Sequence, residues 1–453
     1  MKQLLITPLL FLSLAVMAND YDLQKPFGFC TRSSRTSNAD SYAYNITGGG
    51  CYVYPVTNVS SDKMIILTST GQDMKNQIAN AIKKYDVIIF DGSQGDFIVS
   101  SSIGISSYKN KTLMGINNAR LCTSWHVTQA ITDALDAAGV PNMSTGSGGG
   151  VLPNGVSVTE QAEYYSRKII MELMGDMNET YRNSGIFSFS KCQNIIVRNI
   201  KFVGPGSIDV GGSDLLSFLE TKNSWVDHCE FTDGMDGNFD ITRSSDFNTV
   251  SWCSFSYTDR SYMHQNTNLI GGSDSEATGY LNTTFAFNHW GANCRARMPM
   301  ARVGKIHMLN NYFTSTTASN CINPRKNSEF LVEGNYFGPG VKHYYSQSNA
   351  KAVTWKTTNY ITETGSQTAP TSMGSTVTVP YDYTVADCNL IPEIVKEHVG
   401  ATLYTSVDPT SISVASAFSG SDFHSRVYNL AGQQVADGTK GLVIVKGRLI
   451  ICR

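Results

Sequence analysis

The chain lacks an excess of charge of either sign. Its 453 residues include 35 Lys and Arg against 37 Asp and Glu, a formal net charge of -2. Proteins that bind nucleic acid through electrostatics carry a surplus of basic residues, so the balance argues against a nucleic-acid partner. Charged residues make up only 16% of the chain and hydrophobic residues 41%. This composition excludes a disordered chain and indicates a globular protein with a large core.

Long apolar runs are also missing after the amino terminus. Residues 4–16 are apolar, follow Lys2 and precede small residues near Ala18. This run is shorter than the ~20 residues that a membrane helix needs, and its layout predicts a signal peptide over residues 1–18. We therefore expect an exported protein, secreted or at the cell surface, with no membrane span.

Several catalytic motifs are absent. The chain has no CxxC pair, no HExxH, no GxSxG elbow, no P-loop and no dinucleotide fingerprint, which argues against zinc, hydrolase and nucleotide sites of those kinds. We interpret His228, His264, His289 and His307 as structural strand residues. Export permits disulfides among the ten Cys, but in a chain of this size we expect many of them to be buried as small hydrophobic residues.

A repeat is what the sequence does contain. Six alternating segments each end on an aromatic residue, and these residues lie 29, 24, 35, 23 and 24 positions apart: Phe202, Phe231, Phe255, Trp290, Phe313 and Phe337. Such periods predict a β-solenoid whose inward side chains stack from coil to coil. Cys229 and Cys253 should then be interior neighbours, and the Asn-rich positions 288, 310, 311 and 335 suit bends. A β-sandwich also shows alternation, but it does not explain the aromatic register.

Other elements flank or interrupt the repeat. Residues 73–85 have helical periodicity and precede the apolar stretch DVIIFDG, an arrangement that would cap one end of a solenoid. Residues 123–187 break the repeat with two helical runs and are interpreted as an insertion lying over the solenoid. We therefore expect a main domain over 19–405, followed by a linker and a small β module over 406–453.

Acidic residues are concentrated in one repeat. The segment Trp225–Ile241 holds five acids within fourteen residues: Asp227, Glu230, Asp233, Asp236 and Asp240. Carboxylates at this density suit a hard cation such as Ca²⁺. On an ideal strand Asp236 and Asp240 would lie ~13 Å apart, too far to share an ion, unless Gly237 lets the chain bend. The alternative is a set of solvated turn acids.

Arg295, Arg297 and Arg302 lie just before an alternating run. Guanidinium groups bind carboxylates bidentately. A cation site beside an arginine cluster therefore suits an acidic substrate whose carboxylate bridges the two, which would acidify the proton α to that carboxylate. The alternative is that these arginines pair with nearby acids.

Motifs spread over residues 26–345 resemble those of the pectate lyases of polysaccharide lyase family one. They occur in this order: NITGGG, DVIIFDG, KTLMGINNARL, WVDH, MDGNFDI, SWCSF with LIGGSDS, and RMPMARVGKIHMLNNYF. The resemblance implies an all-β fold, a right-handed parallel β-helix. It also implies Ca²⁺-dependent β-elimination of de-esterified polygalacturonate, which leaves a 4,5-unsaturated sugar.

The resemblance also implies residue roles. Asp214, Asp236 and Asp240 would bind the metal. Arg297 would be the proton-abstracting base and Arg302 its supporting neighbour. Because a base must be unprotonated when it acts, we expect activity to rise toward alkaline pH.

Substrate contacts would come from Arg325 and, less directly, from two positions that depart from the family pattern. Arg243 follows Thr242, which stands where a Lys is usual, and Arg260 replaces a second Lys before the inserted-looking SYMHQNT. Gly212 stands where a further acid is usual, which leaves Asp209 or water to complete the metal shell.

Three alternatives remain at this stage. A hydrolase of the polygalacturonase kind would need an acid pair set for glycosidic attack. A pectin lyase would act on methyl-esterified substrate and typically lacks the calcium acids. A non-catalytic glycan-binding protein or adhesin would not require Arg297.

The carboxyl-terminal stretches VYNLAGQQV and KGLVIVKGR resemble the sorting modules of Bacteroidetes type IX secretion. The alternative is a plain β appendage. We expect a monomer whose partner is pectin or polygalacturonate.

Overall fold

The computed structural model describes residues 25–34, 41–143, 150–152, 154–362 and 370–405, together with short strands near the carboxyl terminus. The chain divides into two compact units, Met1–Val407 and Asp408–Arg453. The predicted signal peptide and most of the predicted linker lie outside the described residues. No helix within the described part of the chain is long and apolar enough to cross a membrane.

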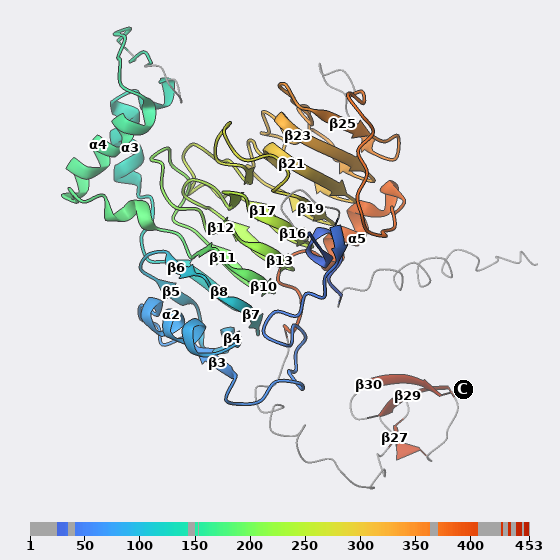
Figure 1. Ribbon diagram of the computed structural model, residues 1–453. Helices are drawn as coiled ribbons and strands as arrows, with labels where there is room; N and C mark the ends of the chain where they lie inside the picture. Colours follow the sequence, from blue (N-terminus) through green and yellow to red (C-terminus); the bar gives the residue numbers. More distant parts are fainter. Residues whose placement is uncertain are drawn as a thin grey trace, which may run out of the picture. The chain divides into compact units, whose positions relative to one another are not determined.

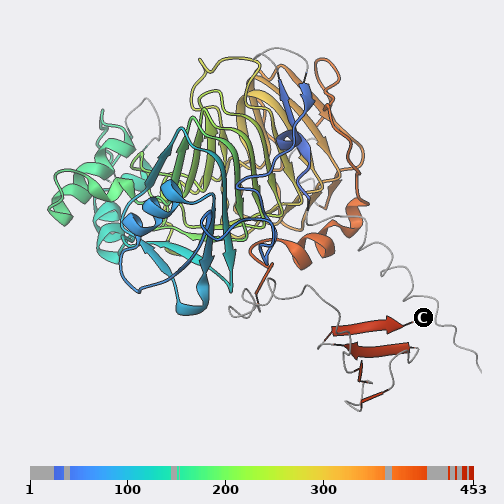
Figure 2. The same cartoon turned by 60° about the horizontal axis from the view of Figure 1, so that its bottom comes forward.

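The first unit winds into a parallel β-helix with three faces (Figure 1, Figure 2). We name each face by one of its strands. The β10 face contains β3 (Met64–Thr68), β4 (Val87–Asp91), β7 (Lys109–Ile116), β10 (Gln193–Arg198), β13 (Lys222–Asp227), β16 (Asp246–Ser251), β19 (Thr283–Ala286) and β25 (Ala352–Trp355). The β12 face contains β6 (Ile103–Ser106), β9 (Phe187–Ser190), β12 (Leu216–Leu219), β15 (Phe239–Thr242) and β18 (Leu269–Ile270).

The third face, the β11 face, is a nine-stranded sheet. It contains β5 (Phe97–Val99), β8 (Arg120–Thr123), β11 (Lys201–Val203), β14 (Glu230–Thr232), β17 (Ser254–Ser256), β20 (His289–Trp290), β22 (Tyr312–Phe313), β24 (Tyr336–Phe337) and β26 (Tyr360–Ile361). Two long strands, β21 (Met300–Leu309) and β23 (Asn323–Glu333), turn the corner between the other two faces and join them into one 15-stranded sheet. The predicted parallel β-helix is confirmed.

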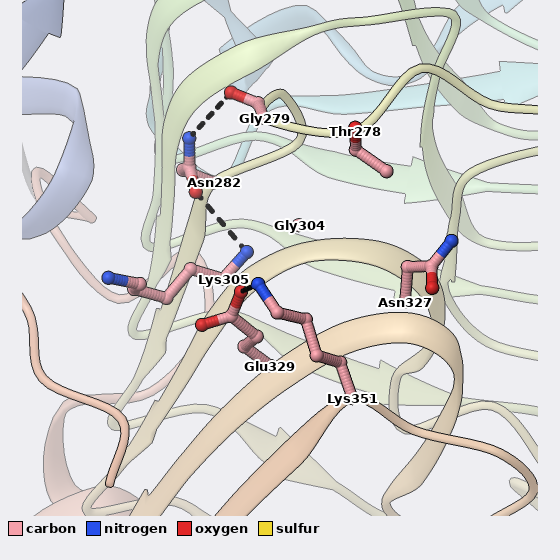
Figure 3. Close-up of a pocket in the computed structure, with 8 residues that line it drawn as sticks. All are labelled: Thr278, Gly279, Asn282, Gly304, Lys305, Asn327, Glu329 and Lys351. Carbon is pink, nitrogen blue, oxygen red and sulfur yellow. Dashed lines mark hydrogen bonds and ion pairs between the residues drawn. The ribbon is translucent and has the colours of Figure 1, made fainter. Parts of the chain in front are cut away.

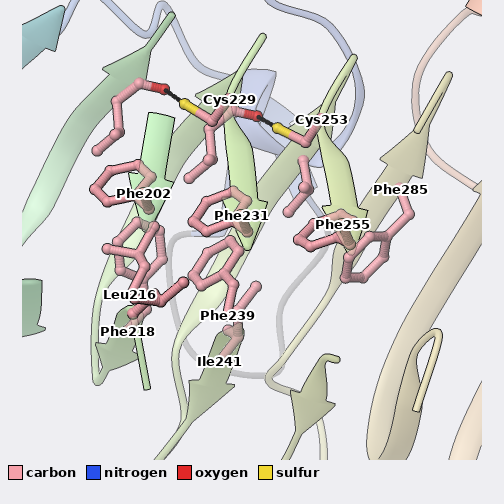
Figure 4. Close-up of a cluster of buried hydrophobic side chains, with 14 of the residues drawn as sticks. Phe202, Leu216, Phe218, Cys229, Phe231, Phe239, Ile241, Cys253, Phe255 and Phe285 are labelled. Atoms are coloured by element: carbon pink, nitrogen blue, oxygen red, sulfur yellow. Dashed lines mark hydrogen bonds between the residues drawn. The ribbon is translucent and has the colours of Figure 1, made fainter. Parts of the chain in front are cut away.

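Each predicted repeat segment contains two strands, one on the β10 face and one on the β11 face. The aromatic residue lies in the second strand, and the six aromatics pair in register from β11 to β24. Their rings are buried and stack with centroids 4.6 to 5.4 Å apart. Figure 4 shows part of this stack, with Cys229 and Cys253 above it. The expectation that both cysteines are interior neighbours is confirmed.

The bends between paired strands are held by asparagine side chains. The Oδ1 atom of each residue accepts a backbone N–H from the preceding coil: Asn311 from Asn288 at 2.9 Å, Asn335 from Asn311 at 3.0 Å and Asn359 from Asn335 at 3.0 Å. The amides thus satisfy backbone donors that the bend removes from the sheets. The nine cysteines described are free, and most are buried, as expected.

Helices close and decorate the coil. The predicted capping helix is α2 (Lys75–Lys84), whose Ile78, Ala81 and Ile82 are buried in the main core. The predicted insertion contains α3 (Gln129–Ala137), η3 (Val140–Asn142), α4 (Ala162–Met174) and η4 (Thr180–Asn183). It branches from the turn between β8 and β9, and α3 and α4 project from one side of the β-helix (Figure 1).

Shorter elements complete the first unit: η1 (Gly28–Thr31), β1 (Arg32–Ser34), β2 (Ser41–Ala43), η2 (Gly92–Gln94), η5 (Cys388–Leu390) and α5 (Ile391–His398). The second unit is a four-stranded antiparallel sheet of β27 (Val427–Tyr428), β28 (Gln434–Val435), β29 (Gly441–Val445) and β30 (Arg448–Cys452).

Candidate functional site

The corner where the chain passes from the β11 face to the β12 face gathers polar residues from successive coils. Asp209 and Asp214 lie in the β11–β12 turn, and Asp236 lies in the β14–β15 turn. The β17–β18 turn contributes His264, and the β20–β21 turn contributes Arg297. Because the coils are stacked in register, equivalent turns become neighbours.

The predicted acids converge at Gly237. An ideal Cβ on Gly237 would lie 2.8 Å from Asp214 Oδ1 and 3.3 Å from Asp240 Oδ1. Both carboxylate oxygens therefore approach the same point, which only a residue without a side chain leaves free. The bend predicted between Asp236 and Asp240 is present, since Asp236 lies in the turn and Asp240 in β15.

Burial and neighbouring acids raise the pKa values of two of these acids. Burial, together with Asp240 and Asp236, raises the pKa of Asp214 well above its usual value. Burial also raises the pKa of Asp240 to about 7, although Arg297 opposes this effect. Asp214 Oδ2 accepts a hydrogen bond from Ser217 at 2.9 Å, whereas its buried Oδ1 has no partner among the described residues. Arg297 therefore offsets these shifts only in part, and one carboxylate oxygen of the cluster remains unpaired among the described residues.

His264 belongs to this cluster, and its interpretation as a strand residue is wrong. Its Nε2 lies 3.0 Å from Asp236 Oδ1 and its Nδ1 lies 3.4 Å from Asp209 Oδ1. The residue sits in a turn with a positive φ of 67°. The segment SYMHQNT departs from the family pattern, which indicates an altered site. The sequence does not show the direction of the His264 ring.

Gly212 stands where the family resemblance implies a further acid, and Asp209 lies in the same turn. A Cβ on Gly212 would lie 2.3 Å from Met235 Sδ and 3.0 Å from the Arg182 carbonyl oxygen. No acid can therefore stand at position 212 without moving its neighbours. Asp209 instead interacts electrostatically with His264, Asp236 and Arg297, and burial raises its pKa.

Arg297 and Arg302 differ in their contacts. Arg297 interacts electrostatically with Asp209, Asp214 and Asp240, yet its guanidinium forms no hydrogen bond or salt bridge with the residues described. Arg302 Nε lies 3.2 Å from Asp274 Oδ1, and its Nη1 donates to the Gly271 carbonyl at 2.8 Å. The alternative that these arginines pair with nearby acids therefore holds for Arg302, and it does not hold for Arg297 among the described residues. Burial and the neighbouring Arg297 lower the pKa of Arg302.

The other predicted arginines lie at differing places. Arg325, in β23, is exposed, interacts electrostatically with Arg302 and donates from Nε to Asn323 Oδ1 at 3.1 Å. Arg243 follows β15, and its backbone N–H donates to Glu276 at 3.0 Å. Arg260 points elsewhere: its Nη1 donates to the Gly204 carbonyl at 3.2 Å.

A cavity of about 500 Å³ lies apart from these residues (Figure 3). Its lining includes Gly304 and Lys305 of β21 and Glu329 of β23. Lys351 Nζ lies 2.5 Å from Glu329 Oε1, so the acid and one of the two lysines are already paired. None of the predicted site residues lines this cavity.

The donor chemistry of the acid cluster suits a hard divalent cation. Carboxylate oxygens are the ligands that Ca²⁺ prefers. Among the described residues, however, no three His, Cys, Asp or Glu side chains already stand as ligands around one point.

Comparison with known proteins identifies the family. A family model described as pectate lyase matches residues 158–416. Pectate lyase A of Aspergillus niger is 30% identical over 240 residues, which cover 50% of this chain and 68% of that protein. Pectate trisaccharide-lyase of Bacillus licheniformis is 32% identical over 224 residues, 46% of this chain and 60% of that protein.

A solved pectate lyase from Paenibacillus sp. 0602 covers 84% of this chain and 97% of its own, with a TM-score of 0.54 and 12% identity, a likeness of fold. The family match spans the turns that carry Asp209, Asp236, His264 and Arg297. The chain is therefore a polysaccharide lyase that belongs to the pectate lyase family.

Proposed function

We propose that this protein is a Ca²⁺-dependent lyase that cleaves de-esterified polygalacturonate by β-elimination, with Arg297 as the base. One observation carries the proposal: the guanidinium of Arg297 has no hydrogen-bond or salt-bridge partner among the described residues, and it interacts electrostatically with carboxylates whose pKa values are raised. Such an arrangement suits a third, charged component that brings both a cation and a carboxylate, as a calcium uronate does.

Asp214, Asp236 and Asp240 would hold the cation, with Asp209 as an additional acid. When bound, Ca²⁺ would neutralise these acids and draw electron density from the substrate carboxylate, which makes the α proton more acidic. The residues themselves supply the geometry, because Gly237 lets Asp214 and Asp240 approach one point.

Arg297 would remove the proton α to the carboxylate. The electron pair of the broken C–H bond forms the 4,5 double bond, the C4–O glycosidic bond breaks, and the departing oxygen takes a proton from water. Arg302 is partly buried nearby, and burial together with Arg297 lowers its pKa. Because a general base must be unprotonated when it acts, activity should rise toward alkaline pH.

Arg325 is the best placed of the proposed substrate-binding residues, because it is exposed and interacts with Arg302. Arg243 would contribute from the next turn of the β12 face. Arg260 would act only on a more distant sugar, since its guanidinium contacts the β11–β12 turn at Gly204.

The test is incubation with polygalacturonate and Ca²⁺, with and without a chelator, followed by ultraviolet absorbance of the unsaturated product. We expect a signal that chelation and Arg297→Ala both abolish. Arg295→Ala is the matched control, because this substitution removes the same charge two positions away, at an exposed residue. Faster cleavage of methyl-esterified pectin, unaffected by chelation, would indicate a pectin lyase. Absence of product under every condition would leave a non-catalytic glycan-binding protein.

We also propose export, through residues 1–18 as a signal peptide and residues 406–453 as a type IX sorting module, and action as a monomer. Comparison of the mass of the protein recovered from medium and from cells would test the cleavage of both segments.

A further inference from the structure

The insertion between β8 and β9 packs directly beneath the acid cluster. It has its own hydrophobic cluster, which includes Ile131, Leu135, Ile170 and Tyr181. The same cluster contains three residues of the β-helix: Ile208, Val210 and Met235. Ile208 and Val210 flank Asp209, and Met235 precedes Asp236. The backbone that presents two of the acids is therefore part of the core of the insertion.

Arg182, in η4 of the insertion, forms hydrogen bonds with the turn between Asp209 and Asp214. Its Nε donates to the Val210 carbonyl at 2.8 Å and its Nη2 to the Gly211 carbonyl at 2.5 Å. Its own carbonyl accepts the Ser213 N–H at 2.8 Å. Three hydrogen bonds from one residue thus fix the four positions that separate the two acids.

The guanidinium of Arg182 is itself held in place. Its Nη1 donates to Glu179 Oε2 at 2.9 Å, and Arg167 of α4 binds both oxygens of Glu179 at 2.7 Å. Charge-assisted bonds of this kind are short and directional. The insertion therefore holds one side of the Arg182 guanidinium while the other side binds the turn.

A second tie connects the insertion to His264. The hydroxyl of Tyr262 hydrogen-bonds to Asp136 Oδ1 of α3. Tyr262 lies two residues before His264, whose ring stands between Asp209 and Asp236. Both the turn that carries Asp209 and the turn that carries His264 are thus fastened to the same helices.

We propose that Arg182 is a positioning residue of the cation site, which sets the affinity for Ca²⁺ by holding the Asp209–Asp214 turn against the repulsion from Asp236. Ligand oxygens must converge to about 2.3–2.6 Å from the ion, and unanchored acids of like charge would move apart. This inference rests on the proposed function of the site. It gives the insertion a role that the β-helix alone does not fill.

The test is calorimetric titration of the full-length protein with Ca²⁺ in the absence of substrate. For Arg182→Gln we expect roughly tenfold weaker binding, as for other groups that orient metal ligands, with kcat at saturating Ca²⁺ near that of the wild type. Arg182→Lys should recover part of the affinity, because an ammonium reaches one carbonyl but lacks the fork that binds two. Lys168→Gln is the matched control: it removes one charge from α4, where Lys168 pairs with Glu160 at 3.4 Å.

Circular dichroism and thermal unfolding would show whether Arg182→Gln folds. If it does not, Glu179→Gln serves in its place, because this change keeps Arg182 and removes the charge that orients it. Unchanged Ca²⁺ affinity in the folded variant overturns the inference, as does a fall in kcat at saturating Ca²⁺ with unchanged affinity. Failure of the wild-type protein to bind Ca²⁺ or to cleave polygalacturonate would overturn the proposed function instead.

Discussion

Arg198, Asp227 and His228 form a second cluster of arginine, aspartate and histidine, on the β10 face. All three are fully buried. Asp227 Oδ2 accepts from Arg198 Nε at 2.8 Å and lies 2.6 Å from His228 Nδ1, while Oδ1 accepts from Ser251 at 2.6 Å. Burial alone would raise the pKa of Asp227, but His228 and Arg198 outweigh it and hold this pKa below its usual value.

The cluster around Arg297 contains the same residue types with the opposite outcome. Asp214 is partly exposed, yet its buried Oδ1 lacks a partner among the described residues and its pKa is raised. Asp227 has three side-chain partners, whereas Asp214 accepts one side-chain hydrogen bond, from Ser217. The number of partners thus decides which charge is stable. A fully paired carboxylate stabilises the fold, whereas a buried carboxylate oxygen without a partner costs stability.

Removing Arg297 should have the largest effect on activity. Arg297→Ala is expected to reduce the rate of product formation about 10²–10⁴-fold, the usual contribution of a general base. Its free energy of unfolding should change little, because the guanidinium has no protein partner among the described residues. Initial rates and urea unfolding measure the two quantities. A large loss of stability with retained activity would show that Arg297 stabilises the fold and does not act in catalysis.

Breaking the paired cluster should have the largest effect on stability. Asp227→Ala leaves the buried Arg198 without its carboxylate and is expected to cost about 3–5 kcal/mol in the free energy of unfolding. Urea denaturation measures this cost. Because Ser251 contributes one hydrogen bond to Asp227, Ser251→Ala should cost only about 1 kcal/mol. Equal, small costs for both variants would contradict the pairing argument.

Removing an unpaired acid should act in the opposite direction. In the absence of Ca²⁺, Asp214→Asn is expected to leave stability unchanged or to raise it by about 1 kcal/mol, because it removes a buried charge that lacks a partner. Thermal unfolding with and without Ca²⁺ checks this, and the stabilisation by Ca²⁺ should disappear in the variant. Asp259→Asn, at an exposed position, is the control. A strongly destabilised Asp214→Asn would show that the acid has a structural role.

The smallest expected effect concerns how the free energy of unfolding depends on pH through a residue outside both clusters, His289. Burial, aided by Lys396, lowers the pKa of His289 to about 4. The folded state therefore binds this proton more weakly than the unfolded state, whose pKa is about 6.5. The stabilising contribution is complete above pH 6.5 and is lost as the pH falls toward 4. His289→Gln should reduce this loss, which urea unfolding at several pH values would measure. An unchanged pH dependence would assign the acid sensitivity to other residues.

The regular part of the molecule was accessible from the sequence because its determinants recur. Phe231 and Phe255 repeat one interior position, and Asn311 and Asn335 repeat one bend, so a single physical rule accounts for many coils. The helical cap and the two helices of the insertion follow from local periodicity. The family resemblance selected Asp214, Asp240 and Arg297, which the structure brings together from two turns and the strand β15.

The irregular turns could not be predicted in the same way. His264 and Arg260 lie in one turn, and their side chains point to different places because of contacts with distant residues: Asp209 for His264 and Gly204 for Arg260. Met235 fills the space beside Gly212, and Asp209 lies in the site through its contact with His264. Such outcomes depend on packing between coils and the insertion, which no local pattern encodes.

The aromatic stack also determines how the molecule opens. Each ring between Phe202 and Phe337 touches the ring before it and the ring after it, so stability passes between nearest neighbours as along a one-dimensional lattice. A terminal coil of the β-helix has one neighbouring coil, and an inner coil has two. Fraying should therefore begin at the ends of the β-helix and reach the coils of Phe231, Phe255 and Trp290 last. Because the turns with Asp236, His264 and Arg297 belong to these inner coils, the corner that they form should persist through partial unfolding that removes the outer coils.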